Sequence, residues 1–271
     1  MIDFNKTRQY TLSIRLSTDG FCFAVHNPKD ANEYAYQPYR IDPLKSVTAN
    51  LKEAIASTEM LKHTYGSVNI LLADSPYTLV PKEFYAKQYD KELYEYNISS
   101  STTNSDTTLH NEVADEQVTV IFAIETQLHK YITAQYPKAE IYASITPLLS
   151  HGVEKSFAAN RKYVLLHPRK HSIDIICCEN TTPFFVNTFH YHDTADALYY
   201  LLNCWSTLGL SQTEDILHIA GEPRHTRALA KELTKFIQNI HIVHPAEEFH
   251  STELARTGEM PFDLQALIVC E

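Results

Sequence analysis

The sequence predicts an α/β protein with mixed sheets, built from two halves that repeat one order of elements. Two observations support this prediction. Residues 161–221 contain three short runs typical of strands, then a helical segment at Thr194–Leu208 and a fourth strand. Residues 1–160 contain a looser copy of that order, beginning with a strand at Tyr10–Leu16. We therefore predict one half at residues 1–160 and the other at residues 161–271.

The first half begins with a strand whose residues alternate: Leu12 and Ile14 face one side and Ser13 faces the other. Asp19-Gly20 is typical of a tight hairpin turn. The elements expected next are strands at Phe21–His26 and Glu33–Ile41, a helix at Thr48–Lys62 and a strand at Val68–Ala73.

The rest of the first half changes composition in the middle. Lys82–Tyr96 has helical spacing of Tyr and Phe. Asn97–Asp115 is rich in Ser, Thr, Asn and Asp, so we predict a polar insertion or loop there. The remaining expected elements are a strand at Gln117–Ala123, a helix at Glu125–Tyr136, a strand at Ala139–Ala143 and a helix from Thr146-Pro147.

The second half repeats the order more clearly. The helix at Thr194–Leu208 has a broad apolar stripe, with Thr194 as its expected cap and Gly209 as its stop. Adjacent Cys177 and Cys178 would point to opposite faces of a strand, so they are poorly placed to chelate one metal. The other expected elements are strands at Ile216–Ala220 and Ile240–Val243 and helices at Thr226–Ile237 and Pro261–Cys270.

Composition and net charge argue against some classes of function. Hydrophobic residues are 44% of the 271, charged residues are 21%, and the formal net charge is −10. Nucleic-acid and anionic-membrane binders need clustered Lys and Arg, so this balance argues against both. No run approaches ~18 apolar residues, the length of a membrane span, and the N-terminus has no apolar signal core. With five irregularly spaced Cys, we expect free thiols and a cytoplasmic location.

The predicted order resembles the ribonuclease-H-like plan. Its duplication resembles the fold of actin, sugar kinases and the heat-shock chaperone ATPases (the ASKHA superfamily). The chain also resembles a bacterial family classed as domain of unknown function 3822. The resembling stretches are Leu12–Phe21, Tyr77–Pro81, Val120–Ile124, Phe189–Leu202 and Ile268–Glu271. This resemblance covers nearly the whole chain, and it implies an architecture without an activity.

Actin-like ATPases hold phosphates with two hairpin turns, in which backbone N–H groups reach the phosphate and an Asp holds hydrated metal. The first such turn here would be Ser17–Phe21, which contains Asp19 and Gly20. The ordinary interpretation is a tight hairpin turn. If a nucleotide binds, Asp19 would contact the metal and Gly20 the phosphate.

The second turn, His167–His171, has neither Asp nor Gly, and Pro168 removes an N–H donor. An adenosine-binding turn would fall at Ile219–Pro223, where only Gly221 is a glycine. The whole chain has six Gly, although close backbone approach to phosphate usually needs them. We therefore expect no cofactor, with ATP and magnesium as the alternative.

His190, His192 and Asp193 form the most suggestive local cluster. On a strand the two histidines would share a face beside the carboxylate, which is a conceivable metal site. A strand end with exposed histidines explains the same pattern.

The function predicted first is a non-catalytic binding or scaffold protein of actin-like fold, a pseudo-ATPase. Its partner would be another protein, and a homodimer is also consistent with the Tyr-rich Lys82–Tyr96 segment. An atypical ATP-binding or ATP-hydrolysing protein is the second hypothesis. A metal-dependent hydrolase that uses the histidine cluster is the third.

Overall fold

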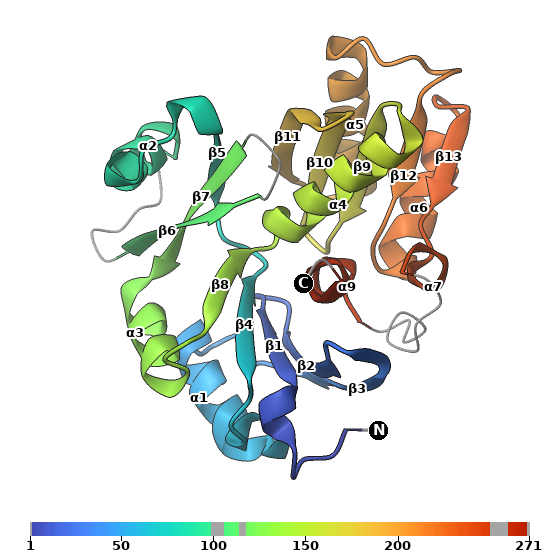
Figure 1. Cartoon of the computed structure of the whole chain (residues 1–271). Helices are drawn as coiled ribbons and strands as arrows, with labels where there is room; N and C mark the ends of the chain where they lie inside the picture. The colour runs from blue at the N-terminus through green and yellow to red at the C-terminus, as the bar shows by residue number, and fades with distance from the viewer. Residues whose placement is uncertain (1, 99–105, 114–117, 250–259, 270–271) are drawn as a thin grey trace. The chain divides into compact units, whose positions relative to one another are not determined.

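The computed structural model describes residues 2–98, 106–113, 118–249 and 260–269 (Figure 1). The chain divides into two compact units, Met1–Thr146 and Pro147–Cys270. The division falls near the start of helix α4 (Ile145–Ala159), which the sequence-based division assigns to the first half.

The first unit contains a five-stranded mixed sheet in the order β3-β2-β1-β4-β8. Strand β1 is central: it pairs antiparallel with β2 and parallel with β4, and all six of its residues are buried. Strand β8 continues the sheet, parallel to β4. The strands are Thr11–Leu16 (β1), Phe21–Asn27 (β2), Asp30–Tyr39 (β3), Ser67–Leu72 (β4) and Glu140–Ala143 (β8).

A second, three-stranded antiparallel sheet belongs to the same unit, in the order β5-β7-β6. Helix α2 (Asp90–Asn97) packs on it through Tyr94, which contacts Val80 and Ile121. The strands are Tyr77–Pro81 (β5), Asp106–Glu112 (β6) and Val118–Glu125 (β7).

Two predictions for this region are wrong. Asp106–Glu112 was expected to be a loop because of its polar residues, but its backbone pairs with β7 along its whole length. Strand pairing therefore overrides local composition. Residues 99–105 and 114–115 of the predicted loop Asn97–Asp115 lie outside the described residues. The helix predicted at Lys82–Tyr96 begins only at Asp90, after two 3₁₀ turns at Lys82–Phe84 and Lys87–Tyr89.

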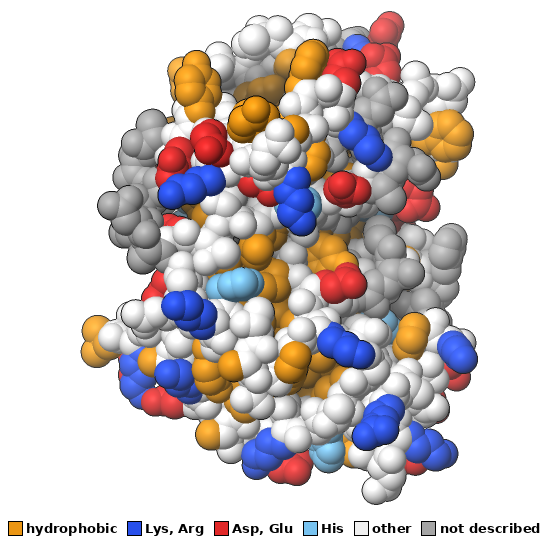
Figure 2. Space-filling model, turned by 60° about the vertical axis from the view of Figure 1, so that its left-hand side comes forward, with side chains coloured by type: hydrophobic (Ala, Val, Ile, Leu, Met, Phe, Trp, Pro, Cys, Tyr) orange, Lys and Arg blue, Asp and Glu red, His pale blue; other side chains and the backbone are white. Residues whose placement is uncertain are grey.

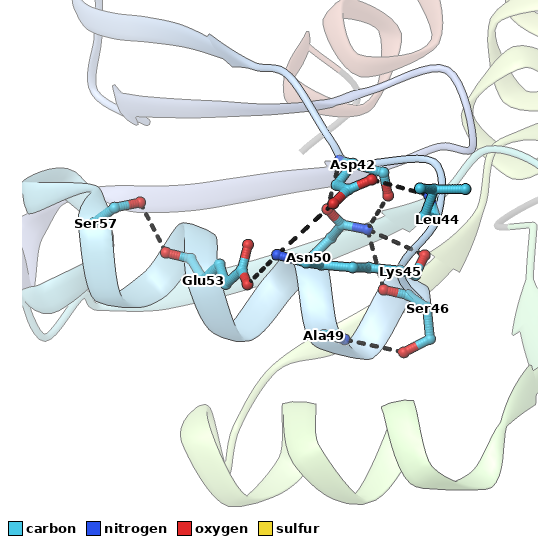
Figure 3. Close-up of polar contacts among 8 residues, drawn as sticks. All are labelled: Asp42, Leu44, Lys45, Ser46, Ala49, Asn50, Glu53 and Ser57. Atoms are coloured by element: carbon cyan, nitrogen blue, oxygen red, sulfur yellow. Dashed lines mark hydrogen bonds and ion pairs between the residues drawn. The ribbon is translucent and has the colours of Figure 1, made fainter.

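Helix α1 (Val47–Ser57) begins at a point fixed by Asn50, as Figure 3 shows. The buried Asn50 side chain accepts a hydrogen bond from Asp42 N (2.8 Å) and donates to the carbonyl oxygens of Asp42 (3.0 Å) and Ser46 (3.1 Å). Ser46 Oγ caps the helix by accepting from Ala49 N (3.2 Å). Val47 is the first residue of this helix. A cation–π contact from Lys52 to the ring of Tyr131 joins α1 to α3 (Thr126–Gln135).

The second unit contains a five-stranded sheet in the order β11-β10-β9-β12-β13. Its strands pair as those of the first unit do: the first strand is central, antiparallel to the second and parallel to the fourth. The fold class predicted from the repeated order is therefore confirmed. The strands are Tyr163–Pro168 (β9), Ser172–Glu179 (β10), Thr182–His190 (β11), Ile216–Ile219 (β12) and Asn239–Ile242 (β13).

Helices cover both faces of this sheet. Cys177 lies in the apolar cluster under α5 and α6, whereas the Sγ of Cys178 lies 3.4 Å from a Cβ built on Gly152 of α4. The two cysteines thus face opposite sides, as predicted. The cap of α5 is Asp193 rather than Thr194: its carboxylate accepts from two backbone N–H groups of the first turn. The helices are Thr194–Thr207 (α5), Pro223–Leu233 (α6), Pro245–Glu248 (α7) and Phe262–Val269 (α9).

Candidate functional site

The turn between β1 and β2 meets Asp74, the second residue after β4. The parallel pairing of the two strands continues to their ends, where Ala73 N donates to Leu16 O at 2.9 Å. Asp74 therefore lies directly beside the turn. Its Oδ2 accepts hydrogen bonds from Thr18 N (2.6 Å), Thr18 Oγ1 (2.9 Å) and Ser17 Oγ (3.0 Å). The chain's own carboxylate thus occupies the donors that an actin-like ATPase would offer to a phosphate.

A pocket of about 220 Å³ opens beside this turn, within the first unit. Its lining is largely apolar, and Val47 at the start of α1 contributes to it. Two carboxylates, Asp74 and Glu125, also line it, and none of the described residues that line it is Lys or Arg. Ser75 closes the wall by donating to Ala123 O at 2.6 Å. A bare phosphate would face like charge here, which is unfavourable.

The two residues predicted for nucleotide contact in this turn are Asp19 and Gly20. Asp19 is exposed, its N–H donates to Ser17 Oγ (3.1 Å), and it does not line the pocket. Gly20 has a φ of +145°, and its N–H donates to Ser17 O (3.2 Å). Both residues therefore serve a tight hairpin turn, and their contact with a nucleotide stays a prediction.

The second turn, between β9 and β10, also surrounds a carboxylate. Register places His167, Asp174 and Thr188 side by side on three neighbouring strands. The Asp174 carboxylate is hydrogen-bonded to His167 Nδ1 (3.0 Å). It also accepts hydrogen bonds from Thr188 Oγ1 (2.7 Å) and Arg169 Nη2 (2.9 Å). The Arg169 side chain is mostly buried against this carboxylate.

The charge state of Asp174 follows from these contacts. Burial alone would raise its pKa, but the Arg169 charge and the hydrogen bonds from His167 and Thr188 outweigh burial and hold the pKa well below its usual range. Asp174 is therefore an ionised group in the core at neutral pH, and it neutralises the cation that could otherwise attract an anion to this turn.

Gly221, predicted for nucleotide contact, packs on the second turn. Its φ is +155°, and a Cβ at this position would lie 3.0 Å from Pro168 O. The absence of a side chain is thus required by the close approach of two segments of the second unit. Its contact with a nucleotide stays a prediction.

The three residues of the predicted metal cluster lie at the end of β11 and the start of α5, and their binding of a metal stays a prediction. His190 ends β11, and His192 N donates to Asp196 Oδ2 at 3.1 Å. The Asp193 carboxylate is used by the cap of α5, where it accepts from Ala195 N at 2.8 Å. Across the described ranges, no group of three or more His, Cys, Asp and Glu side chains is placed to hold a metal ion.

Sequence reasoning missed Asp74 and Asp174. A signal for Asp74 exists, because Leu72-Ala73-Asp74-Ser75-Pro76 recurs as Ile219-Ala220-Gly221-Glu222-Pro223 at the matching strand end of the second half. Since carboxyl ends of neighbouring parallel strands meet at one edge, both runs can be expected to touch a hairpin turn. Asp174 had no such signal, because a lone Asp within an apolar strand does not reveal its partners.

The duplicated topology and its paired turns define a protein of the actin-like ATPase fold. Solved structures agree. A protein of actin-like ATPase fold and unknown function from Bacteroides thetaiotaomicron is 35% identical over all of both chains, with a TM-score of 0.87. A chain of the PilM–PilN type IV pilus biogenesis complex has a TM-score of 0.59 at 15% identity, covering 96% of this chain and 97% of that one. This second likeness shows the fold alone.

The chain belongs to the family described as "Protein of unknown function (DUF3822)", whose model matches residues 1–240. The family that the sequence resembles is thereby confirmed. Among curated proteins, none matches the chain. Within the described residues, no helix combines the length and the apolar character needed to cross a membrane.

Proposed function

We propose that this protein is a non-catalytic member of the actin-like fold that acts by binding another protein. The observation that carries the proposal is the Asp74 carboxylate, which accepts three hydrogen bonds from the first turn. A nucleotide phosphate would have to displace this carboxylate and would then remain beside it. Charge-assisted hydrogen bonds of this kind are roughly twice as strong as neutral ones, so the displacement is costly.

The second turn supports the same proposal in a different way. Arg169 in this turn is paired with Asp174 at 2.9 Å, and the turn's other cation is the exposed Lys170. Pro168 supplies no N–H donor. The first turn thus has no Lys or Arg, and the second lacks an N–H donor at Pro168, so each lacks part of the combination that holds a polyphosphate.

A protein partner fits the surface better than a nucleic acid does. The face drawn in Figure 2 carries Lys and Arg side chains interspersed with Asp and Glu, rather than one basic field. A chain of related fold occurs in the PilM–PilN complex, which is an assembly of proteins. The free thiols of Cys177 and Cys204 are consistent with action in the reducing cytoplasm.

The proposal is tested by thermal unfolding of the whole chain with and without millimolar Mg-ATP and Mg-ADP. A ligand present at a hundred times its dissociation constant would add about 2.7 kcal/mol to the free energy of unfolding. We expect no shift in the midpoint. A clear shift would overturn the proposal in favour of an ATP-binding protein, and loss of that shift in Asp19→Ala would then assign Asp19 to the metal.

A further inference from the structure

Leu44 is the most exposed large apolar residue among those that the structure describes, with an exposed fraction of 93%. A single exposed leucine is common on protein surfaces, so exposure alone indicates no function. What distinguishes Leu44 is the fixed backbone that carries it, in the turn at residues 42–46 that joins β3 to helix α1. Figure 3 shows its side chain pointing away from the Asn50 amide.

Hydrogen bonds hold this turn on both sides of Leu44. Asp42 Oδ1 accepts from Leu44 N at 3.0 Å, and Lys45 N donates to Asp42 O at 3.1 Å. The buried Asn50 amide, which also holds Asp42, donates to Lys45 O at 3.3 Å. Lys45 Nζ pairs with Glu53 Oε1 at 2.5 Å. A side chain on such a fixed turn is suited to anchor an interface, because little conformational freedom is lost when it binds.

A matching cavity lies at the other end of helix α1. It is a pocket of about 340 Å³ within the first unit. The Tyr65 hydroxyl donates to Met60 O at 2.7 Å. The Tyr136 hydroxyl donates to Leu61 O at 3.2 Å. Both hydroxyls are thus satisfied within the unit, so the pocket can accept an aliphatic side chain without leaving them unpaired. Its apolar and aromatic lining residues are Leu61, Tyr65, Val68, Tyr136 and Pro137.

The charges around the leucine and around the pocket are complementary. Beside the leucine, Asp42 and Glu53 share one lysine. Lys62 and Lys138 line the pocket, and none of its described lining residues is Asp or Glu. Outside the pocket, the exposed Glu59 pairs with Lys62 at 3.0 Å. An excess of opposite charge around an apolar contact favours association of the two surfaces and fixes their orientation.

The leucine and the pocket lie at opposite ends of one helix, which makes this surface complementary to itself. Leu44 precedes the start of α1, and Leu61 follows its end. The helix has 11 residues and is therefore about 16 Å long. When a two-fold axis crosses the middle of α1, the helices of two copies run antiparallel, and the leucine of each copy lies at the pocket end of the other. A second copy of this chain thus supplies both contacts at once.

We propose that the protein forms a two-fold dimer in which Leu44 of each copy enters the pocket beside Tyr65 and Tyr136 of the other. This inference goes beyond the proposed function, because it does not depend on whether the chain binds a nucleotide or a different protein.

Sedimentation equilibrium of the full chain at a series of concentrations measures the dissociation constant of the dimer. We expect wild type to be a dimer that dissociates on dilution. Leu44→Asp should raise the dissociation constant at least about a hundredfold, because each dimer loses two buried leucine side chains. Its unfolding midpoint should match that of wild type, as for other exposed substitutions. The matched control is Tyr96→Asp, at a residue of α2 that is 87% exposed and does not line the pocket. It should leave the dissociation constant unchanged.

A cross-linking experiment tests the pairing of the leucine with the pocket. Thr64 is an exposed residue of the pocket wall. Under mild oxidation, a mixture of Leu44→Cys and Thr64→Cys should form a disulfide between the two variants faster than a mixture of Leu44→Cys and Tyr96→Cys does. Mass spectrometry of the linked peptides identifies the pairs. Equal rates in the two mixtures would overturn the pairing.

Three other results would overturn the inference. A wild-type chain that stays monomeric at every concentration would leave Leu44 to a different protein. A dimer that Leu44→Asp leaves intact, or that Tyr96→Asp weakens equally, would place self-association on another surface. Failure of the proposed function is separate, since it is read from stabilisation of the wild-type chain by Mg-ATP or Mg-ADP.

Discussion

The ends of β4 and β12 can be compared directly, because they occupy the same position in the two sheets. Ala73 N donates to Leu16 O in the first unit (2.9 Å), and Ala220 N donates to Leu166 O in the second (3.0 Å). The next residue touches the hairpin turn in each case. It is Asp74 in the first unit, and it is Gly221, without a side chain, in the second.

This difference decides where each turn obtains its negative charge. In the first unit the carboxylate comes from the end of a parallel strand and borders a pocket. In the second unit backbone packs on backbone, and the charge comes from Asp174 within the sheet, where it is 1% exposed. Each turn therefore has a carboxylate beside it, and that carboxylate comes from a different position in the two units. The first arrangement borders a pocket that a ligand could enter.

The largest effect is expected for Asp174→Ala. The substitution would leave Arg169 and His167 in the core without their carboxylate, which should cost about 3–5 kcal/mol of unfolding free energy. Urea unfolding followed by fluorescence of Trp205 measures it, because this is the only Trp in the sequence and it is buried in the second unit. Thr188→Val is the control, with an expected loss of about 1 kcal/mol for one hydrogen bond. Equal losses of unfolding free energy in the two variants would contradict a stabilising ion pair between Asp174 and Arg169.

The second unit should also lose stability as pH falls from 6.5 to about 4. Burial lowers the pKa of His151 to about 4, and that of His218 to about 4, from 6.5. As pH falls, the two histidines therefore become protonated in the unfolded chain before they do in the folded one. Each lowers the free energy of unfolding by up to about 3 kcal/mol between pH 6.5 and about 4. The decline should be shallower in His218→Phe, measured by urea unfolding at a series of pH values. An unchanged slope in the variant would mean that His218 is not held neutral by burial.

In the first unit, Asp74→Ala should cost about 2 kcal/mol of unfolding free energy, because Thr18 N–H and two hydroxyls lose a charged acceptor, although Asp74 itself is exposed. Hydrogen exchange of the β1 and β4 amides measures the loss in this unit. Asp19→Ala in the same turn should stay within about 0.5 kcal/mol of wild type, as exposed substitutions do. The reverse ranking would assign the turn's organising carboxylate to Asp19.

The smallest effect is expected for Gly221→Ala, about 1–2 kcal/mol, because the new Cβ meets Pro168 O and the φ of +155° is strained for alanine. Gly209→Ala is the matched control: its φ of +65° is also unfavourable, but no atom lies within 4 Å of the new Cβ. Trp205 fluorescence in urea compares the two variants. A loss of stability in Gly221→Ala no larger than in Gly209→Ala would mean that the close approach of Gly221 to Pro168 O does not exclude a side chain.

The repeated order of elements could be predicted because alternation in β1 and the apolar stripe of α5 are local signals. Strand β6 could not, since Thr107, His110 and Asn111 are polar and become a strand through pairing with β7. The tight turn at Gly20 was likewise readable from the sequence.

The roles of the Asp74 and Asp174 carboxylates could not be predicted from local sequence signals. Asp74 acts on Thr18 across 56 positions of sequence, and Asp174 acts through partners on two other strands. Such contacts depend on register, which the sequence does not specify residue by residue. The recurrence of Ala73-Asp74 as Ala220-Gly221 is the one local trace of the site.

The central claim is that Asp74 takes the place of a phosphate in the first turn. Its most direct test is the midpoint of thermal unfolding of wild type and of Asp74→Ala, each with and without inorganic phosphate. We expect phosphate to raise the midpoint of Asp74→Ala more than that of wild type, because only in the variant have the donors of the turn lost the Asp74 carboxylate. A shift in wild type equal to or larger than that of the variant would contradict it.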